Sequence, residues 1–112
     1  MHTRFEMSAL TAQLALIAIK GEVDIESAPE LLGHIEDALT QAQSVAVCFR
    51  DCTYLDSSVV NVLVKMHKIA VARRLRVVVV ANPGSGPHRI FEVAGLRHLM
   101  PLAESLEKAA LA

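Results

Sequence analysis

Apolar and polar positions follow two different spacings along this chain, and their alternation predicts strands separated by helices. Five segments have strand character: residues 3–8, 13–19, 45–49, 77–81 and 99–102. The third and fourth are uninterrupted apolar runs, which are typical of central strands covered on both faces of a parallel sheet. The first is expected at a sheet edge, and so is the last, because its Pro101 cannot donate a backbone hydrogen bond.

Helical spacing of apolar residues connects these strands. It extends over four segments: residues 27–42, 57–74, 88–94 and 103–112. Ser27 is expected to cap the first helix, with Pro29 and Glu30 in its opening turn. Gly95 is expected to end the third helix. Turns or loops are predicted at three places: residues 21–24, 50–55 and 82–87.

Strands that alternate with helices predict one α/β domain over residues 1–112, with a mainly parallel sheet of about four to five strands and about four helices. The first two strands can instead pair as a hairpin, which would make the sheet mixed. Ligands and partners of such sheets tend to use the loops after the carboxyl ends of the strands. Asp24 and the pair Asp56-Ser57 both follow strands, so they can converge on that edge.

Composition narrows the class of protein. The chain has 112 residues, of which 53% are hydrophobic, and its formal net charge is -1. Nothing in it predicts the basic surface that a nucleic-acid partner would need. No apolar run approaches the roughly 18 residues of a membrane span, and no secretory leader is recognisable, so we expect a cytoplasmic protein.

Cysteine and histidine patterns predict neither a disulfide framework nor a metal site. Cys48 and Cys52 are the only cysteines, and two thiols in a cytoplasmic protein are expected to stay reduced. The five histidines are scattered without the spacing of a zinc site. We therefore expect no metal and no cofactor.

Residues Asp56, Ser57 and Ser58 stand where a strand region gives way to a helix. The free backbone N–H groups and the positive dipole end of a helix favour anions at such a place. Two interpretations stay open, because the segment can cap the helix or carry a phosphate. A hydrolase nucleophile at Ser57 is a third interpretation. The sequence has no glycine-flanked nucleophile elbow and identifies no base, so we expect a protein that is not an enzyme.

The helix predicted at residues 57–74 has an apolar arc wider than one sheet contact needs. Beside the face expected to meet the sheet, Val60, Val64 and His67 form a second stripe. Either neighbouring helices cover this stripe, or it is partly exposed and docks a protein partner. Both interpretations stay open.

Several motifs, taken in order, resemble the STAS domain family, which is the fold of bacterial anti-sigma factor antagonists. The family's Gly-Glu-Leu-Asp turn is similar to Gly21-Glu22-Val23-Asp24. Its Asp-Ser-Ser-Gly signature is similar to Tyr54-Leu55-Asp56-Ser57-Ser58. Three helical segments complete the resemblance, which covers nearly the whole chain: residues 27–31, 91–96 and 105–109.

This resemblance implies a regulatory function. In the family, the serine after the signature Asp is phosphorylated by a partner kinase that is also the anti-sigma factor. Carried over, the phosphorylated residue is Ser57, and Asp24, Asp56 and Ser58 support the site. The unphosphorylated antagonist binds the anti-sigma factor and frees the sigma factor, whereas the phosphorylated form does not. The implied protein acts in transcription regulation through protein–protein contacts, and its partner brings the ATP.

Two positions depart from the family pattern. Val59 stands where the family usually has Gly, and Cys48 stands where it usually has Asp or Asn. Cys48 thus removes one polar group expected near the site, and Asp51 in the following loop is a candidate substitute for it. These departures favour an alternative from another class, which is a STAS-type accessory subunit of a membrane lipid-transport ATPase that is not phosphorylated.

Overall fold

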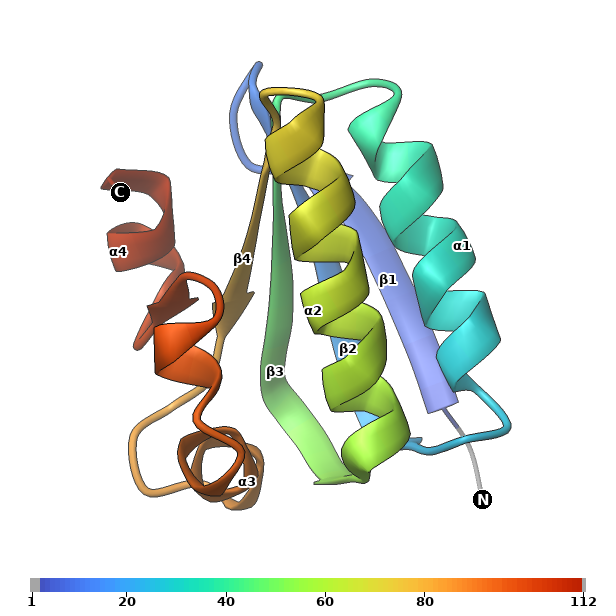
Figure 1. Cartoon of the computed structure of the whole chain (residues 1–112), viewed down its shortest axis with the longest axis vertical. Helices are drawn as coiled ribbons and strands as arrows, with labels where there is room; N and C mark the ends of the chain where they lie inside the picture. The colour runs from blue at the N-terminus through green and yellow to red at the C-terminus, as the bar shows by residue number, and fades with distance from the viewer. Residues whose placement is uncertain (1–2, 112) are drawn as a thin grey trace.

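Five strands form one sheet in the spatial order β1-β2-β3-β4-β5 (Figure 1). The computed structural model of the chain describes residues 3–111. β1 runs antiparallel to β2, and the other neighbouring pairs are parallel. The mixed α/β sheet with an N-terminal hairpin is therefore confirmed. The strands are β1 (Thr3–Ala9), β2 (Leu14–Val23), β3 (Ser44–Leu55), β4 (Arg76–Val80) and β5 (Leu102–Ala103).

Two long helices, α1 and α2, lie side by side across one face of this sheet (Figure 1). The short C-terminal helix α4 packs against β3, β4 and β5. Helix α3 lies beside the carboxyl-terminal half of β3, and the 3-10 turn η1 packs against α3 (Figure 1). The helical elements are α1 (Ala28–Leu39), α2 (Ser57–Ala72), α3 (Gly86–Val93), η1 (Leu96–His98) and α4 (Leu106–Leu111).

The core has two parts because successive strand residues point to opposite faces of the sheet. Val45 and Val47 of β3 point to the α1 and α2 side, where the larger cluster of buried residues lies. Ala46 and Cys48 point to the other side, where they share a smaller cluster with Ala109 of α4. Both faces of the central strands are thus covered, which explains their uninterrupted apolar runs.

Two predicted turns are wrong, because β2 and β3 both extend further than their apolar runs. β2 continues through Gly21, whose positive φ of 84° accompanies a shift in its register with β3. β3 continues over the predicted loop at residues 50–55 and stays paired with β2 to the Val23–Leu55 pair. Polar side chains are tolerated there because they point to solvent, while Cys52 is buried.

Smaller differences concern the ends of elements. Ser27 occupies the N-cap position of α1, but its hydroxyl accepts a hydrogen bond from the backbone N–H of Asp24 (2.9 Å) and caps no helical N–H. Pro29 and Glu30 lie in the first turn of α1 as predicted. Gly95 follows α3 with a φ of 71°, the left-handed conformation expected of a residue that ends a helix.

Three elements are shorter than predicted, namely β5, the last helix and the first helix. β5 is an edge strand of two residues that begins only after Pro101, because residues 99–101 form the turn that follows η1, where the backbone N–H groups of Leu99 and Met100 bond to the Leu96 carbonyl. The last helix begins at Leu106, and its predicted end at residue 112 lies outside the described residues. The first helix ends at Leu39, three residues before the predicted end.

Candidate functional site

The junction between β3 and α2 is organised by the Asp56 carboxylate. Asp56 is extended (φ -122°, ψ -178°) and occupies the N-cap position of α2. Its Oδ1 accepts a hydrogen bond from the backbone N–H of Ser58 (3.0 Å) and a second one from the Ser58 hydroxyl. A carboxylate in this position satisfies a free N–H of the first turn and interacts favourably with the helix dipole. Asp56 is therefore the residue that caps α2.

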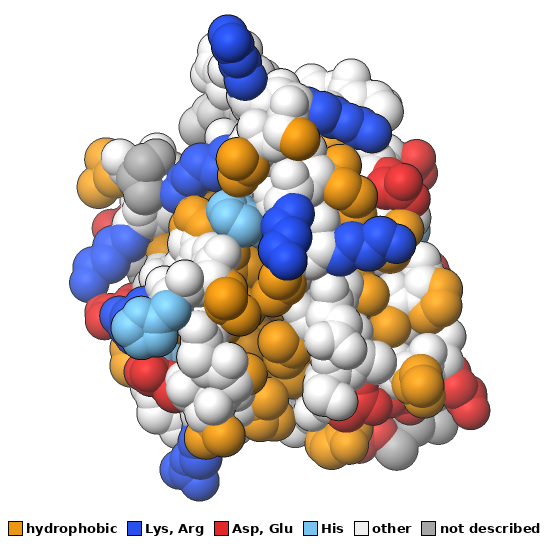
Figure 2. Space-filling view, viewed as in Figure 1, with side chains coloured by type: hydrophobic (Ala, Val, Ile, Leu, Met, Phe, Trp, Pro, Cys, Tyr) orange, Lys and Arg blue, Asp and Glu red, His pale blue; other side chains and the backbone are white. Residues whose placement is uncertain are grey.

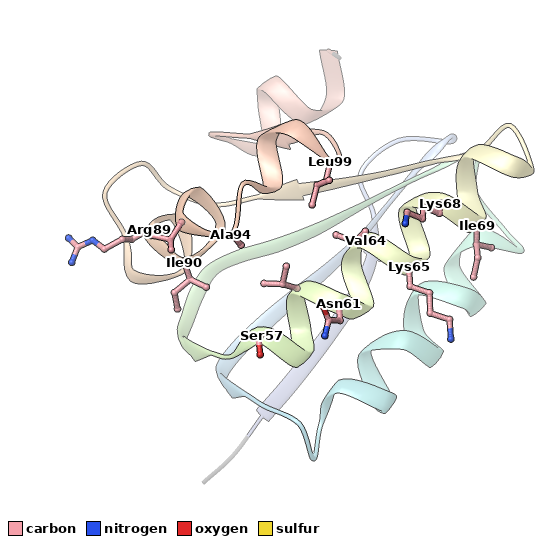
Figure 3. A pocket seen from close by; sticks show the side chains of 12 residues that line it. Ser57, Asn61, Val64, Lys65, Lys68, Ile69, Arg89, Ile90, Ala94 and Leu99 are labelled. Atoms are coloured by element: carbon pink, nitrogen blue, oxygen red, sulfur yellow. The ribbon is translucent and has the colours of Figure 1, made fainter.

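Ser57 is left free by this arrangement. It is the first residue of α2, its side chain is exposed, and its hydroxyl has no hydrogen-bond partner among residues 3–111. In Figure 3 the Ser57 hydroxyl points away from the body of the helix. Ser58, by contrast, is half-buried and bonded to Asp56. Of the two serines, Ser57 is therefore the more exposed, and its hydroxyl is the one without a partner in the described part of the chain.

Asp24 reaches the same edge of the sheet as Asp56. Val23 and Leu55 are paired across β2 and β3, whose spacing is about 5 Å, so Asp24 and Asp56 follow neighbouring strands at the same level of the sheet. The Asp24 carboxylate accepts hydrogen bonds from the backbone N–H groups of Glu26 (2.9 Å) and Ser27 (3.2 Å). Asp24 thus fixes the turn before α1 and adds a second carboxylate to the edge that bears Ser57.

The two departures from the family pattern lie away from this edge. Val59 is 0% exposed and belongs to the larger core cluster, so its side chain does not crowd the surface beside Ser57. Cys48 faces the opposite side of the sheet among residues packed on α4. Asp51 lies in β3 with its carboxylate 4.0 Å from the Lys20 ammonium, so it does not replace a carboxylate at the site.

A groove of about 940 Å³ starts at Ser57 and runs between α2 and the α3–η1 segment (Figure 3). Two of the predicted docking residues line it, namely Val60 and Val64. Val60 is only 8% exposed and also joins the core, whereas Val64 is half-buried. The third, His67, is half-buried and does not line the groove. Neighbouring elements thus cover part of the stripe and leave part of it facing the groove.

Sequence reasoning missed the opposite wall of this groove. That wall contains Ile90 and Val93 of α3 together with Leu99, which follows η1. The spacing of apolar residues in α3 could have indicated this wall. Ile90 and Val93 lie three positions apart on one side of the helix, while Phe91 is buried in the core. The edge-on contact of Phe49 with Phe91, at a centroid distance of 5.0 Å, fixes α3 against β3.

The pKa values of two ionisable side chains, the buried Cys52 and the half-buried His67, are shifted by burial. Burial raises the pKa of the Cys52 thiol, and the nearby Glu22 carboxylate acts in the same direction, while a hydrogen bond to the Tyr54 carbonyl opposes them. Burial lowers the pKa of His67, whose Nδ1 has no hydrogen-bond partner in the described part of the chain. Neither group belongs to the edge that carries Ser57.

Within residues 3–111, no cluster of three His, Cys, Asp or Glu side chains is arranged to hold a metal ion. The helices of that same part of the chain include none with the length and apolar character to cross a membrane.

Comparison with known proteins agrees with the fold. A curated relative, the anti-sigma-B factor antagonist of Bacillus subtilis (strain 168), is 26% identical over 91 residues, which cover 81% of this chain and 83% of the relative. An anti-sigma factor antagonist from Mycobacterium paratuberculosis has a TM-score of 0.86 at 18% identity, covering 98% of this chain and 92% of that one. The unphosphorylated form of the anti-sigma factor antagonist SpoIIAA has a TM-score of 0.77 at 22% identity, covering 96% and 93%.

The match to a family model extends over most of the chain. The model described as "Mlab, STAS domain" matches residues 7–103, which include the end of β1, the other four strands, α1, α2, α3 and the Asp56-Ser57-Ser58 junction. The solved structures establish the fold, and the matched model establishes the family. The chain therefore belongs to the STAS domain family, and its relatives include anti-sigma factor antagonists.

Proposed function

We propose that this protein is a cytoplasmic anti-sigma factor antagonist in a partner-switching pathway. In this proposal it is not an enzyme but the substrate and binding partner of an anti-sigma factor kinase. One observation supports the proposal most strongly, which is the exposed and unbonded hydroxyl of Ser57 at the first position of α2. The similarity to the Bacillus subtilis antagonist supports the same class of function.

The local geometry favours Ser57 over Ser58 as the phosphoacceptor. A kinase needs a hydroxyl that can enter its active site, and the Ser58 hydroxyl is held by the Asp56 carboxylate. Phosphorylation of Ser57 would leave the Asp56 cap in place, because that cap uses the Ser58 backbone N–H. The fold is therefore expected to survive the modification.

The effect of a phosphate at Ser57 would fall on binding. It adds about -1.5 to -2 charges to an edge that already carries the carboxylates of Asp24 and Asp56. No Lys or Arg side chain forms an ion pair with either carboxylate within residues 3–111. An acidic partner surface that docks on this edge would meet an uncompensated cluster of negative charge and would be repelled.

The test is phosphorylation in vitro, followed by the intact mass of the protein. Purified protein is incubated with ATP and each candidate anti-sigma factor kinase, in parallel with Ser57→Ala and Ser58→Ala as matched variants. The proposal expects one added phosphate on the wild type and on Ser58→Ala, and none on Ser57→Ala. A phosphate that persists on Ser57→Ala would contradict the assignment of the site.

A second candidate function is an accessory subunit of a membrane lipid-transport ATPase. The mainly apolar groove beside Ser57 supports it, because such a surface can hold a partner without any phosphate. The matched family model, described as "Mlab, STAS domain", is compatible with either candidate. The same mass experiment separates them when it is combined with affinity purification. Absence of a phosphate adduct with every kinase, together with co-purification of a transport ATPase, would favour the second.

A further inference from the structure

The charges of this chain are strongly segregated around α2 and α3. Between Ser57 and Phe91 lie six of the eleven Lys and Arg residues and none of the twelve Asp and Glu residues. The remainder of the chain is correspondingly acidic. A protein whose formal net charge is only -1 thus presents one cationic segment, and that segment contains most of the groove that starts at Ser57.

The walls of this groove are mainly apolar and open to solvent. Val93 is 86% exposed and Leu99 is 50% exposed, although both are large apolar side chains. Figure 2 shows apolar side chains gathered near the centre of this face, with Lys and Arg side chains beside them. An open, apolar trough of this kind is typical of a surface that another chain covers. The complete apolar lining is Val60, Val64, Ile69, Ile90, Val93, Ala94 and Leu99.

Three cations line the groove: Lys65, Lys68 and Arg89. No carboxylate of the described chain forms a salt bridge with any of them. Other exposed cations do have such partners, for example Lys108, whose ammonium lies 2.9 Å from the Glu104 carboxylate. The groove thus combines mainly apolar walls with cations that are available for an external acidic partner.

We propose that this groove binds an amphipathic helix of a partner protein, with its apolar side against the apolar walls and acidic residues against Lys65, Lys68 and Arg89. The length agrees with this occupant. The α2 residues that line the groove run from Ser57 to Ile69, which is about 18 Å along the helix axis, or a little over three turns of a docked helix. Apolar anchors on one face of such a helix recur at every third or fourth residue.

The inference extends the proposed function, since Ser57 stands at one end of the same groove. A phosphate on Ser57 would bring negative charge to the place where the acidic helix begins or ends. Like charges would then weaken docking, whereas the apolar contacts further along α2 would remain. The phosphate would therefore repel the acidic residues of the helix docked in the groove. This part of the inference rests on phosphorylation at Ser57.

Nuclear magnetic resonance titration with designed peptides tests the groove without any kinase. The probe is a stapled amphipathic helix of about 16 residues, with Leu on one face and Glu on the other, since shorter isolated helices are marginally stable. Its matched control replaces every Glu with Lys. A third arm uses sodium decanoate, which presents a small apolar anion in place of a helix.

The acidic peptide is expected to shift the amide signals of Val64, Ile90 and Val93, and the basic peptide is expected to leave them unchanged. The double variant Lys65→Glu, Lys68→Glu should bind the acidic peptide about tenfold more weakly, because two exposed charge pairs become repulsive. The double variant Arg4→Glu, Lys108→Glu makes the same charge change away from the groove and should bind like the wild type. Phosphoserine at position 57 should weaken binding in the same direction as the Lys65 and Lys68 changes.

Three results would overturn the proposal. These are equal binding of the acidic and basic peptides, signal shifts that map outside the groove, or saturable binding of decanoate without binding of the acidic peptide. The last result would assign the groove to a small apolar anion. Any of these results would contradict the groove proposal but not the proposal that Ser57 is phosphorylated. Conversely, a failure of every kinase to modify Ser57 would not affect the peptide titration of the unphosphorylated groove.

Discussion

Removal of the Asp56 carboxylate should destabilise the protein, whereas removal of the Ser57 hydroxyl should not. In Asp56→Ala, α2 loses the acceptor for the Ser58 backbone N–H, and the Ser58 hydroxyl loses its partner as well. Loss of an N-cap costs about 1 kcal/mol, within a range of about 0.5–2. The hydroxyl of half-buried Ser58 also loses its hydrogen-bond acceptor, which destabilises the fold further. We therefore expect a loss of about 1–2 kcal/mol in the free energy of unfolding.

Urea denaturation followed by circular dichroism measures this loss, and thermal unfolding gives an independent value. For a domain of about this size, a loss of 1 kcal/mol lowers the melting temperature by roughly 4 °C, so Asp56→Ala should melt roughly 4–8 °C below the wild type. Asp56→Asn keeps a side chain that can cap a helix and should recover most of the difference. Ser57→Ala should remain within about 0.5 kcal/mol of the wild type, as exposed substitutions usually do.

The opposite pattern would refute this reasoning. If Ser57→Ala were as destabilised as Asp56→Ala, the Ser57 hydroxyl would be part of the helix cap and not a free group. The proposal that a kinase phosphorylates Ser57 would then lose its main structural support. Asp56→Ala with wild-type stability would likewise show that the carboxylate does not cap α2.

Three further predictions concern other parts of the chain. Gly95→Ala should lower the free energy of unfolding by about 1 kcal/mol, because Gly95 has a φ of 71°. Gly33→Ala in the interior of α1 should raise it by up to about 1 kcal/mol, because an added Cβ meets nothing within 4 Å. Equal effects of the two changes in urea denaturation would contradict this. Because burial lowers the pKa of His67, the unfolded chain binds the proton more readily, so the free energy of unfolding should fall as pH drops below about 6.5. His67→Gln should reduce that fall, and a pH profile that is the same in His67→Gln and the wild type would count against the lowered pKa of the half-buried His67. Buried Cys48 and Cys52 should react with a disulfide reagent about tenfold or more slowly in the folded protein than in urea, and fast labelling of native protein would contradict their placement.

The order of strands and helices could be predicted because apolar spacing follows burial closely in this chain. The uninterrupted runs became the central strands β3 and β4, and the wide apolar arc became α2. The carboxyl-terminal half of β3 could not be predicted, since its polar residues are exposed and its strand conformation depends on pairing with β2 through register shifts. Such pairing joins residues about thirty positions apart, which local spacing does not encode.

The candidate site could be located but not resolved from sequence. Asp56 and Ser57 can both cap a helix chemically, and the backbone decides between them, because Asp56 is extended while Ser57 already belongs to α2. Only the α2 wall of the groove could be predicted from the sequence, as the stripe that contains Val60 and Val64. Its other wall depends on where α3 packs, and that position is set by the contact between Phe49 and Phe91 across the fold.

Affinity for an anti-sigma factor partner, compared between the unmodified protein and the same protein carrying phosphoserine at position 57, tests the central claim most directly. Isothermal titration calorimetry would measure both dissociation constants, with Ser58→Ala as a control that keeps the free Ser57 hydroxyl. We expect the unmodified protein to bind the partner and the phosphorylated protein to bind it about tenfold or more weakly, a loss of about 1.4 kcal/mol in the binding free energy. Equal affinities of the two forms would contradict this claim.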